Sequence, residues 1–211
     1  MSQESEPAAQ KLPPGRHGLP RQFVLHNQRA RLVDAATQVF GTRSYAEARV
    51  ADVLELAAIS RKTFYEQFRD KEDCFLAAYE AAAQRAEEQI RAAARGKHDR
   101  AGQLRAGVDA LLRFLCDEPQ LARLLVVEVM GAGPAARKRR DQVIESFEAI
   151  LTGDGGTGVP AELVVGGFWE VVHHRVATDR ADELPGLTNA LADCALALID
   201  VPEEARQAAA G

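Results

Sequence analysis

The sequence predicts an all-α fold of about nine helices. From residue 21 onward alanine and leucine dominate, and no alternating run of β-branched residues indicates a strand. Hydrophobic residues make up 46% and charged residues 27% of the 211 residues, which is typical of a folded soluble protein. No apolar run approaches the ~18 residues of a membrane span, and the polar, acidic N-terminus lacks the features of a secretory signal. We therefore expect a cytoplasmic protein.

The first helix is predicted at about residues 22–40, and a second, short helix follows near residue 50. A third runs from Ser60, a plausible N-cap, to Phe68. A long helix begins at Asp70, which can cap the following amides, and ends near Arg95 because Gly96 stops it. The predicted core-facing residues of the first three helices recur at helical spacing: Leu32, Val33, Ala36, Val39 and Phe40; Val50, Val53, Leu54 and Ala57; Phe64 and Phe68.

Charge is unevenly distributed along the chain. Residues 1–71 contain 11 Lys and Arg against 8 Asp and Glu, a net charge of +3, whereas the remainder contains 15 against 23, a net charge of -8. This asymmetry indicates that only the first part meets a polyanion.

The outer face of the third helix carries groups that can read a DNA groove. If Phe64 and Phe68 face the core, the step of about 100° per residue places Arg61, Lys62 and Tyr65 outward. Thr63 and Gln67 lie at the flanks of that face. Two short helices joined by a tight turn form a helix-turn-helix, whose second helix can enter the major groove. A solvated helical hairpin without a DNA partner is the alternative.

The segment around this helix resembles the DNA-binding domain of TetR-family transcriptional regulators. The resemblance covers residues 29–79 and rests on the turn at residues 57–60, on the T-F-Y-x-x-F-x-x-K-E pattern of residues 63–72, and on Phe40-Gly41 and Tyr45 upstream. It implies an N-terminal three-helix DNA-binding domain, followed by a helical domain for ligand binding and dimerisation. The implied domain limits are a flexible tail at 1–20, the DNA-binding domain at 21–70, the second domain at 71–205 and a short tail at 206–211.

The resemblance also implies which residues contact DNA. The expected set is Arg49, Arg61, Lys62, Thr63, Tyr65, Gln67 and Lys71. Lys71 is also expected to contact DNA on physical grounds, because the free amides and the dipole at the start of a long helix favour binding of a phosphate. Two departures from the family pattern matter. Ala48-Arg49 replaces a Ser/Thr pair, so a helix cap is lost and Arg49 takes the place of a hydroxyl contact; Ala58 replaces the turn glycine, so the turn either avoids positive φ or is strained by about 1 kcal/mol.

The rest of the chain is too apolar to be a spacer and predicts a second, buried surface. Residues 163–176 are apolar on nearly every side, which suits a helix buried both in its own subunit and against a partner. In the resembled family the last two helices pair with their twins in a four-helix interface. The expected interface residues are Gly166, Gly167, Phe168, Leu187, Leu191, Cys194 and Leu198. One large monomeric core is the alternative.

A small-molecule pocket is expected in this second domain. Candidate lining residues are Phe114, Glu128, Met130, Phe147, Trp169 and His173. Each aromatic residue could instead be ordinary core. Glu128 is the most suggestive, because a carboxylate amid apolar residues needs a partner or a solvated face.

Several motifs are set aside. The GxGxxG of residues 153–158 follows a helical segment rather than a strand and is interpreted as an interhelical loop. His173 and His174 point about 100° apart, so they do not share one metal ion. The basic run 137–140 is interpreted as a solvated helix face. Cys74, Cys116 and Cys194 form no CxxC pair, so neither a disulfide framework nor a zinc cluster is encoded. We expect no metal and no cofactor.

Together these observations predict a homodimeric transcriptional repressor, not an enzyme. It would bind a palindromic double-stranded DNA operator and be released by a small molecule of unknown identity. The alternative is an all-α enzyme or ligand carrier in which the helical hairpin is purely structural. Binding to a palindromic duplex discriminates the two.

Overall fold

The computed structural model describes residues 20–152 and 159–199, and within these residues it is built from helices without a strand. The α-helices are α1 (Arg21–Thr42), α2 (Val50–Ala57), α3 (Arg61–Gln67), α4 (Lys71–Ala94), α5 (Arg100–Asp117), α6 (Pro119–Val126), α7 (Pro134–Thr152), α8 (Val159–Ala177) and α9 (Thr188–Ile199). Two 3-10 helices, Glu128–Met130 and Ala181–Leu187, connect them. The all-α prediction is confirmed. The GxGxxG segment and the two expected tails, apart from Pro20, lie outside the described residues.

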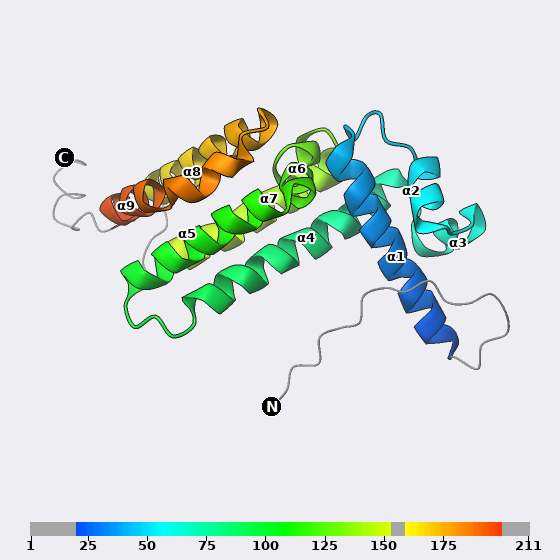
Figure 1. The fold of residues 1–211 in the computed structure, drawn as a ribbon, viewed down its shortest axis with the longest axis horizontal. Coiled ribbons are helices and arrows are strands. Elements are labelled where there is room, and N and C mark those ends of the chain that lie inside the picture. Colours follow the sequence, from blue (N-terminus) through cyan, green and yellow to red (C-terminus); the bar gives the residue numbers. More distant parts are fainter. Residues whose placement is uncertain (1–19, 153–158, 200–211) are drawn as a thin grey trace.

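Helices α1–α3 form one end of the molecule, here called the head, and α4–α9 form the body (Figure 1). Helix α4 leads from the head along the body and packs against α5, while α8 and α9 lie on the other side of α5. One apolar core runs through both parts, from Phe40 and Phe64 in the head through Phe75 to Leu112 and Leu124 in the body. No helix among the described residues is long and apolar enough to cross a membrane.

The turn between α2 and α3 is strained at Ala58. Its φ of 51° and ψ of 48° place it in the left-handed region, which costs an L-residue with a side chain about 1 kcal/mol relative to glycine. The Ile59 amide donates to the Leu54 carbonyl across this turn, at 3.1 Å. The strained alternative of the sequence analysis is therefore the one that the structure adopts.

Two helices of the body end within apolar or polar stretches that could have continued them. Helix α6 ends at Val126, and a 3-10 turn follows at Glu128–Met130. Helix α8 ends at Ala177, and two residues later Asp179 adopts a positive φ of 55°. The Arg180 amide then donates to the Arg175 carbonyl at 2.7 Å, which closes the end of the helix.

The head is joined to the body by a buried carboxylate. Glu128 is only 6% exposed; one of its oxygens accepts a hydrogen bond from the Tyr45 amide at 2.7 Å, and the other lies 3.1 Å from Arg123 Nη2. Close by, a Cβ on Gly41 would lie 2.5 Å from the Gln120 carbonyl oxygen, so α1 approaches α6 as closely as a glycine permits. The partner that Glu128 needs is therefore supplied by the protein and not by a ligand, contrary to its assignment to the pocket.

We predict that Glu128→Ala lowers the free energy of unfolding by about 2–4 kcal/mol, because it leaves the Tyr45 amide and the half-buried Arg123 without their shared acceptor. Chemical denaturation followed by circular dichroism measures this. The matched control is Glu118→Ala, which removes a carboxylate from an exposed ion pair with Arg85, and it should cost no more than ~1 kcal/mol. Equal losses in the two variants would contradict the role given to Glu128.

Candidate DNA interface and body cavity

Helix α3 presents a polar face to solvent. Phe64 and Phe68 are buried, at 0% and 2% exposure, whereas Arg61, Lys62 and Tyr65 are exposed. Tyr65 is 53% exposed even though its ring packs at nearly a right angle to that of Phe64, with the ring centres 5.2 Å apart. The structure thus separates the two faces as the helical period indicates, and three side chains able to donate hydrogen bonds project from the outer one.

The beginning of α3 is fixed by Ser60. The Ser60 hydroxyl oxygen accepts from the Thr63 amide at 3.1 Å, and the two hydroxyl oxygens are 2.9 Å apart. This is the N-cap that the sequence predicts. The half-buried Thr63 side chain therefore belongs to the cap as well as to the flank of the outer face.

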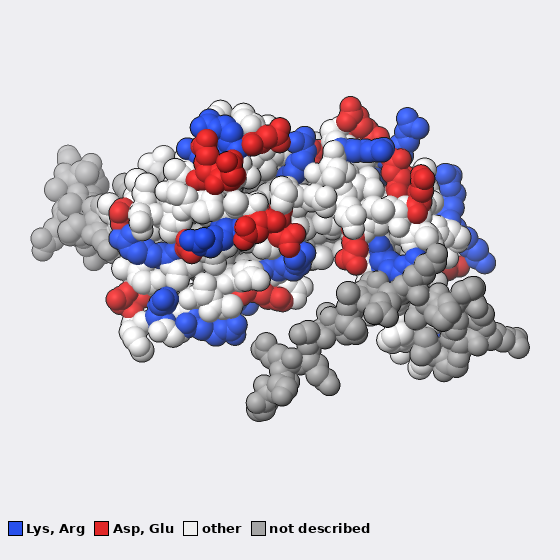
Figure 2. All heavy atoms as spheres, viewed as in Figure 1, with Lys and Arg blue, Asp and Glu red and all other residues white. Residues whose placement is uncertain are grey.

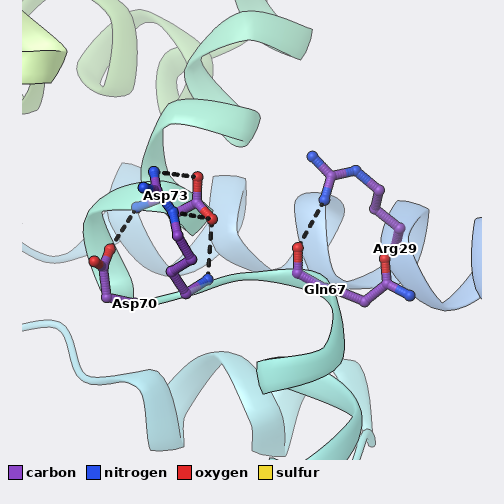
Figure 3. Close-up of polar contacts among 5 residues, drawn as sticks. Arg29, Gln67, Asp70 and Asp73 are labelled. Carbon is purple, nitrogen blue, oxygen red and sulfur yellow. Dashed lines mark hydrogen bonds and ion pairs between the residues drawn. The ribbon is translucent and has the colours of Figure 1, made fainter.

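The end of α3 is fixed by a polar cluster that joins it to α1 and α4 (Figure 3). The Gln67 carbonyl accepts from Arg29 Nη1 at 3.2 Å, and the Arg29 guanidinium lies 4.5 Å from the centre of the Phe68 ring. Asp70 caps α4 by accepting from the Asp73 amide at 2.8 Å, while Asp73 accepts from the Arg69 amide at 3.0 Å. The hydrogen bond from this amide lowers the pKa of Asp73, since it favours the carboxylate.

Lys71 lies inward, where it holds the segment between α1 and α2. Its ammonium donates to the carbonyls of Tyr45 and Ala48, at 2.7 and 3.1 Å, and lies 4.1 Å from the centre of the Tyr45 ring. Burial lowers the pKa of Lys71 and, together with the charge of Glu72, raises that of Tyr45 to about 12. An ammonium has three N–H donors, so at most one of them is left for a phosphate.

Arg49 occupies the N-cap position of α2 with an exposed side chain. Its amide donates to the Asp52 carboxylate at 2.8 Å, and Asp52 also pairs with Arg43 at 3.4 Å. The hydroxyl cap missing from the sequence is thus replaced by a carboxylate three residues later that reaches back, as in one half of a capping box. On the face shown in Figure 2, basic side chains occur at the end formed by the head, interspersed with acidic ones.

An apolar cavity lies in the body, between α4, α5, α8 and α9. Of the expected ligand residues it includes Trp169. Phe168 and Leu191, which are expected at a dimer interface, also line it. Arg100 and Gln103 are its polar groups. The apolar lining residues are Ile90, Ala94, Leu104, Gly107, Val108, Leu111, Val164, Val165, Phe168, Trp169, Leu191 and Ala195.

Three of the six expected ligand residues meet at a second site, and the other three do not join them. Met130 and His173 line an open groove between α7 and α8, which Trp169 also borders. Phe114 is part of the core, at 8% exposure, and Phe147 has a side chain outside the described part of the structure. The structure therefore brings together Met130, Trp169 and His173, whereas Glu128 binds the Tyr45 amide and Phe114 belongs to the core.

The expected interface residues on α8 and α9 differ in exposure. A Cβ added to Gly166 or Gly167 would meet nothing within 4 Å, and Leu163 on the same helix is 64% exposed. Cys194 on α9 is exposed, whereas Leu187, at the end of the 3-10 helix before α9, packs partly against the core. The Leu198 side chain lies outside the described residues.

Sequence reasoning missed Arg29, Asp73 and Arg123 as residues that position the head. A signal was present for two of them. Arg29 lies in register with Leu32 on the core-facing side of α1, where a charged residue is unexpected. Asp73 follows the capping residue Asp70 by three positions, which is the spacing of a capping box. Nothing local marks Arg123, because its partner Glu128 lies beyond the end of its own helix.

Comparisons with known proteins agree with this geometry. Residues 32–78 match the family described as bacterial regulatory proteins, tetR family. The HTH-type transcriptional activator FasR of Mycolicibacterium smegmatis is 26% identical over 125 residues, which cover 59% of this chain and 57% of that relative. The match therefore spans little more than half the length of the relative.

Solved structures share the fold. The fatty acid degradation regulator FadR of Bacillus halodurans superposes with a TM-score of 0.70 at 21% identity, over 80% of this chain and 94% of that one. FadR of Bacillus subtilis, solved in complex with stearoyl-CoA, gives a TM-score of 0.67 at 20% identity, over 81% and 97%. The helix-turn-helix segment, residues 32–78, thus matches the tetR family of bacterial regulatory proteins, and the chain shares the overall fold of the two FadR structures.

Proposed function

We propose that this protein is a transcriptional repressor that binds a palindromic operator as a homodimer and is released by a small apolar ligand. The observation that carries the proposal is the exposed face of α3, with Arg61, Lys62 and Tyr65 opposite the buried Phe64 and Phe68. The major groove is about 12 Å wide and admits one α-helix. A repressor acts here by occupying DNA that the transcription machinery requires.

The roles within the DNA interface follow from side-chain chemistry. The Arg61 guanidinium can donate two hydrogen bonds to one guanine edge, and Lys62 provides a point charge for a base or a phosphate. Tyr65 and Thr63 offer hydroxyls to the backbone, and the exposed Arg49 reaches a phosphate from the start of α2. Gln67 and Lys71 complete the set; Lys71 contributes chiefly by holding the segment after α1 in place.

We predict that Arg61→Ala relaxes the base preference at one position of each half-site by about 1–3 kcal/mol. Tyr65→Ala should instead weaken binding to all sequences alike, because it removes a backbone contact. Selection from random duplexes followed by anisotropy titration measures both effects. Lys138→Ala, which removes an exposed charge on α7, serves as the control and should bind as the wild type does. Failure of the wild type to enrich any sequence would favour the ligand-carrier alternative.

The sign of regulation needs its own test. The relative FasR is named an activator, so similarity alone does not decide between activation and repression. A reporter placed downstream of the selected site should lose expression when the protein is produced. A gain in expression would reverse the sign and leave the DNA-binding proposal intact.

The homodimer is proposed to form through α8 and α9. Support comes from the open space at Gly166 and Gly167, from the exposed Leu163, and from the need of a helix-turn-helix protein for two heads spaced about 34 Å or a multiple of it apart. Small residues permit two helices to approach closely, and an exposed leucine supplies apolar area.

We predict that Gly167→Leu yields a folded monomer, because the new side chain finds room within its own subunit but blocks the approach of a second copy. Light scattering after gel filtration gives the mass. Gly186→Leu is the matched control, since a Cβ there also meets nothing within 4 Å, and it should remain a dimer. A monomeric wild type, or a dimeric Gly167→Leu variant, would exclude this interface.

The ligand is proposed to be an acyl chain bound in the cavity between α4, α5, α8 and α9. Almost all of the lining is apolar, with Arg100 and Gln103 as the polar groups, which suits a long hydrocarbon attached to an anionic group. The Bacillus subtilis structure in complex with stearoyl-CoA supports the same ligand class. Coupling between the two sites is reciprocal. If the acyl ligand lowers the affinity for the operator by some factor, the operator lowers the affinity for the acyl ligand by the same factor.

We predict that stearoyl-CoA changes the fluorescence of Trp169, the one tryptophan of the chain and a lining residue of the cavity. Acetyl-CoA, which lacks the long chain, should give no change. Val108→Phe should weaken the binding of stearoyl-CoA at least ~10-fold by filling the cavity, since each lost buried CH₂ costs about 0.8 kcal/mol. Leu56→Phe, at an exposed position of α2 outside the cavity lining, is the control. Equal affinity of Val108→Phe and the wild type would place the ligand elsewhere.

A further inference from the structure

One face of helix α1 is buried in the core along the second half of the helix and carries basic residues along the first half. Residues 32, 36 and 39 of this face contribute Leu32, Ala36 and Val39 to the core. Continued toward the start of the helix at the same spacing, the face carries Arg29, Leu25 and Arg21. The amphipathic pattern thus changes from apolar to basic where the helix leaves the core.

The whole beginning of α1 is basic. Residues 21–33 contain Arg21, His26, Arg29 and Arg31 and no aspartate or glutamate. Arg31 donates to the Ala57 carbonyl at the end of α2, and Arg29 is held by α3. Arg21 and His26 are exposed.

These residues border a groove shared with α3. The groove is lined by Arg21, Leu25, His26 and Arg29 from α1, and by Glu66 and Gln67 from the end of α3. Glu66 is the only acidic residue of that lining. Figure 1 shows the first turns of α1 extending past α3 and away from the body. A basic surface of α1 is thereby continuous with the exposed face of α3.

We infer that residues 21–31 of α1 bind the sugar–phosphate backbone of duplex DNA beside the segment that α3 contacts. The inference rests on the proposed DNA-binding function and extends it, because the match to the tetR family begins only at residue 32. A solvent-exposed face that carries basic residues and no carboxylate creates a positive potential that attracts a polyanion, and this face lies beside the helix that is proposed to enter the DNA groove. Eleven helical residues span about 16 Å, which corresponds to roughly five base pairs at 3.4 Å each.

The test compares two duplex lengths. Random duplexes are first selected with the wild-type protein, and the enriched site is then prepared as its shortest bound form and with eight further base pairs on each side. The wild type should bind the longer duplex at least ~5-fold more tightly, with a steeper dependence of log affinity on log salt. The double variant Arg21→Gln, His26→Gln should lose this gain, its salt slope on the longer duplex should fall by about one, and its affinity for the shorter duplex should not change.

Controls separate this inference from the function on which it rests. Arg95→Gln removes an exposed arginine at the end of α4 remote from the head and should bind both duplexes as the wild type does. Arg61→Ala should weaken binding to both lengths. Equal wild-type affinity for the two lengths, or equal effects of the double variant on both, would overturn the role of α1 alone. If the wild-type protein bound no DNA at all, both the proposed function and the role of α1 would be overturned.

Discussion

The contacts of the buried Glu128 carboxylate determine how the head sits on the body. One oxygen holds the backbone of the segment after α1, through the Tyr45 amide, and the other pairs with Arg123 on α6. A carboxylate in an apolar setting is stable only when its oxygens are satisfied, so this arrangement tolerates little displacement of head against α6. The close packing of Gly41 on α1 against Gln120 on α6 holds the same two parts together.

Two helices of the body, α4 and α6, therefore hold the head, and they differ in whether they border the cavity. Helix α4 connects the head to the cavity directly: Asp73 and Lys71 fix one end to the chain just after α3 and to the segment before α2, while Ile90 and Ala94 line the cavity near the other. Helix α6 holds the head through Glu128 and takes no part in that cavity lining. The head is thus attached to the body at two places, one on a helix that borders the cavity and one on a helix that does not.

The sequence predicts helix faces and helix caps, which depend on neighbouring residues. It does not predict contacts between residues that are far apart in the chain. Helical spacing was sufficient to place Phe64 inside and Arg61 outside, and capping residues located the starts of α3 and α4. The sequence marks Glu128 as a carboxylate in need of a partner, but periodicity cannot reveal an amide 83 positions earlier in the chain. The charge of Lys71 is visible in the sequence and suggests a phosphate contact, whereas the two carbonyls to which it donates are brought near only by folding.

Helix α3 is fixed at both ends by residues that do not belong to its outer face. At one end the strained backbone conformation of Ala58 is maintained by the neighbouring contacts. The Ser60 cap and the burial of Phe64 stabilise α3 by more than the strain at Ala58 costs. At the other end Arg29 and Asp73 hold the backbone around Gln67 and Arg69. Positions 61, 62 and 65 bear none of these contacts, so their side chains can change with small effect on folding. The groups that would discriminate between DNA sequences are thus separated, residue by residue, from the groups that keep the helix in place.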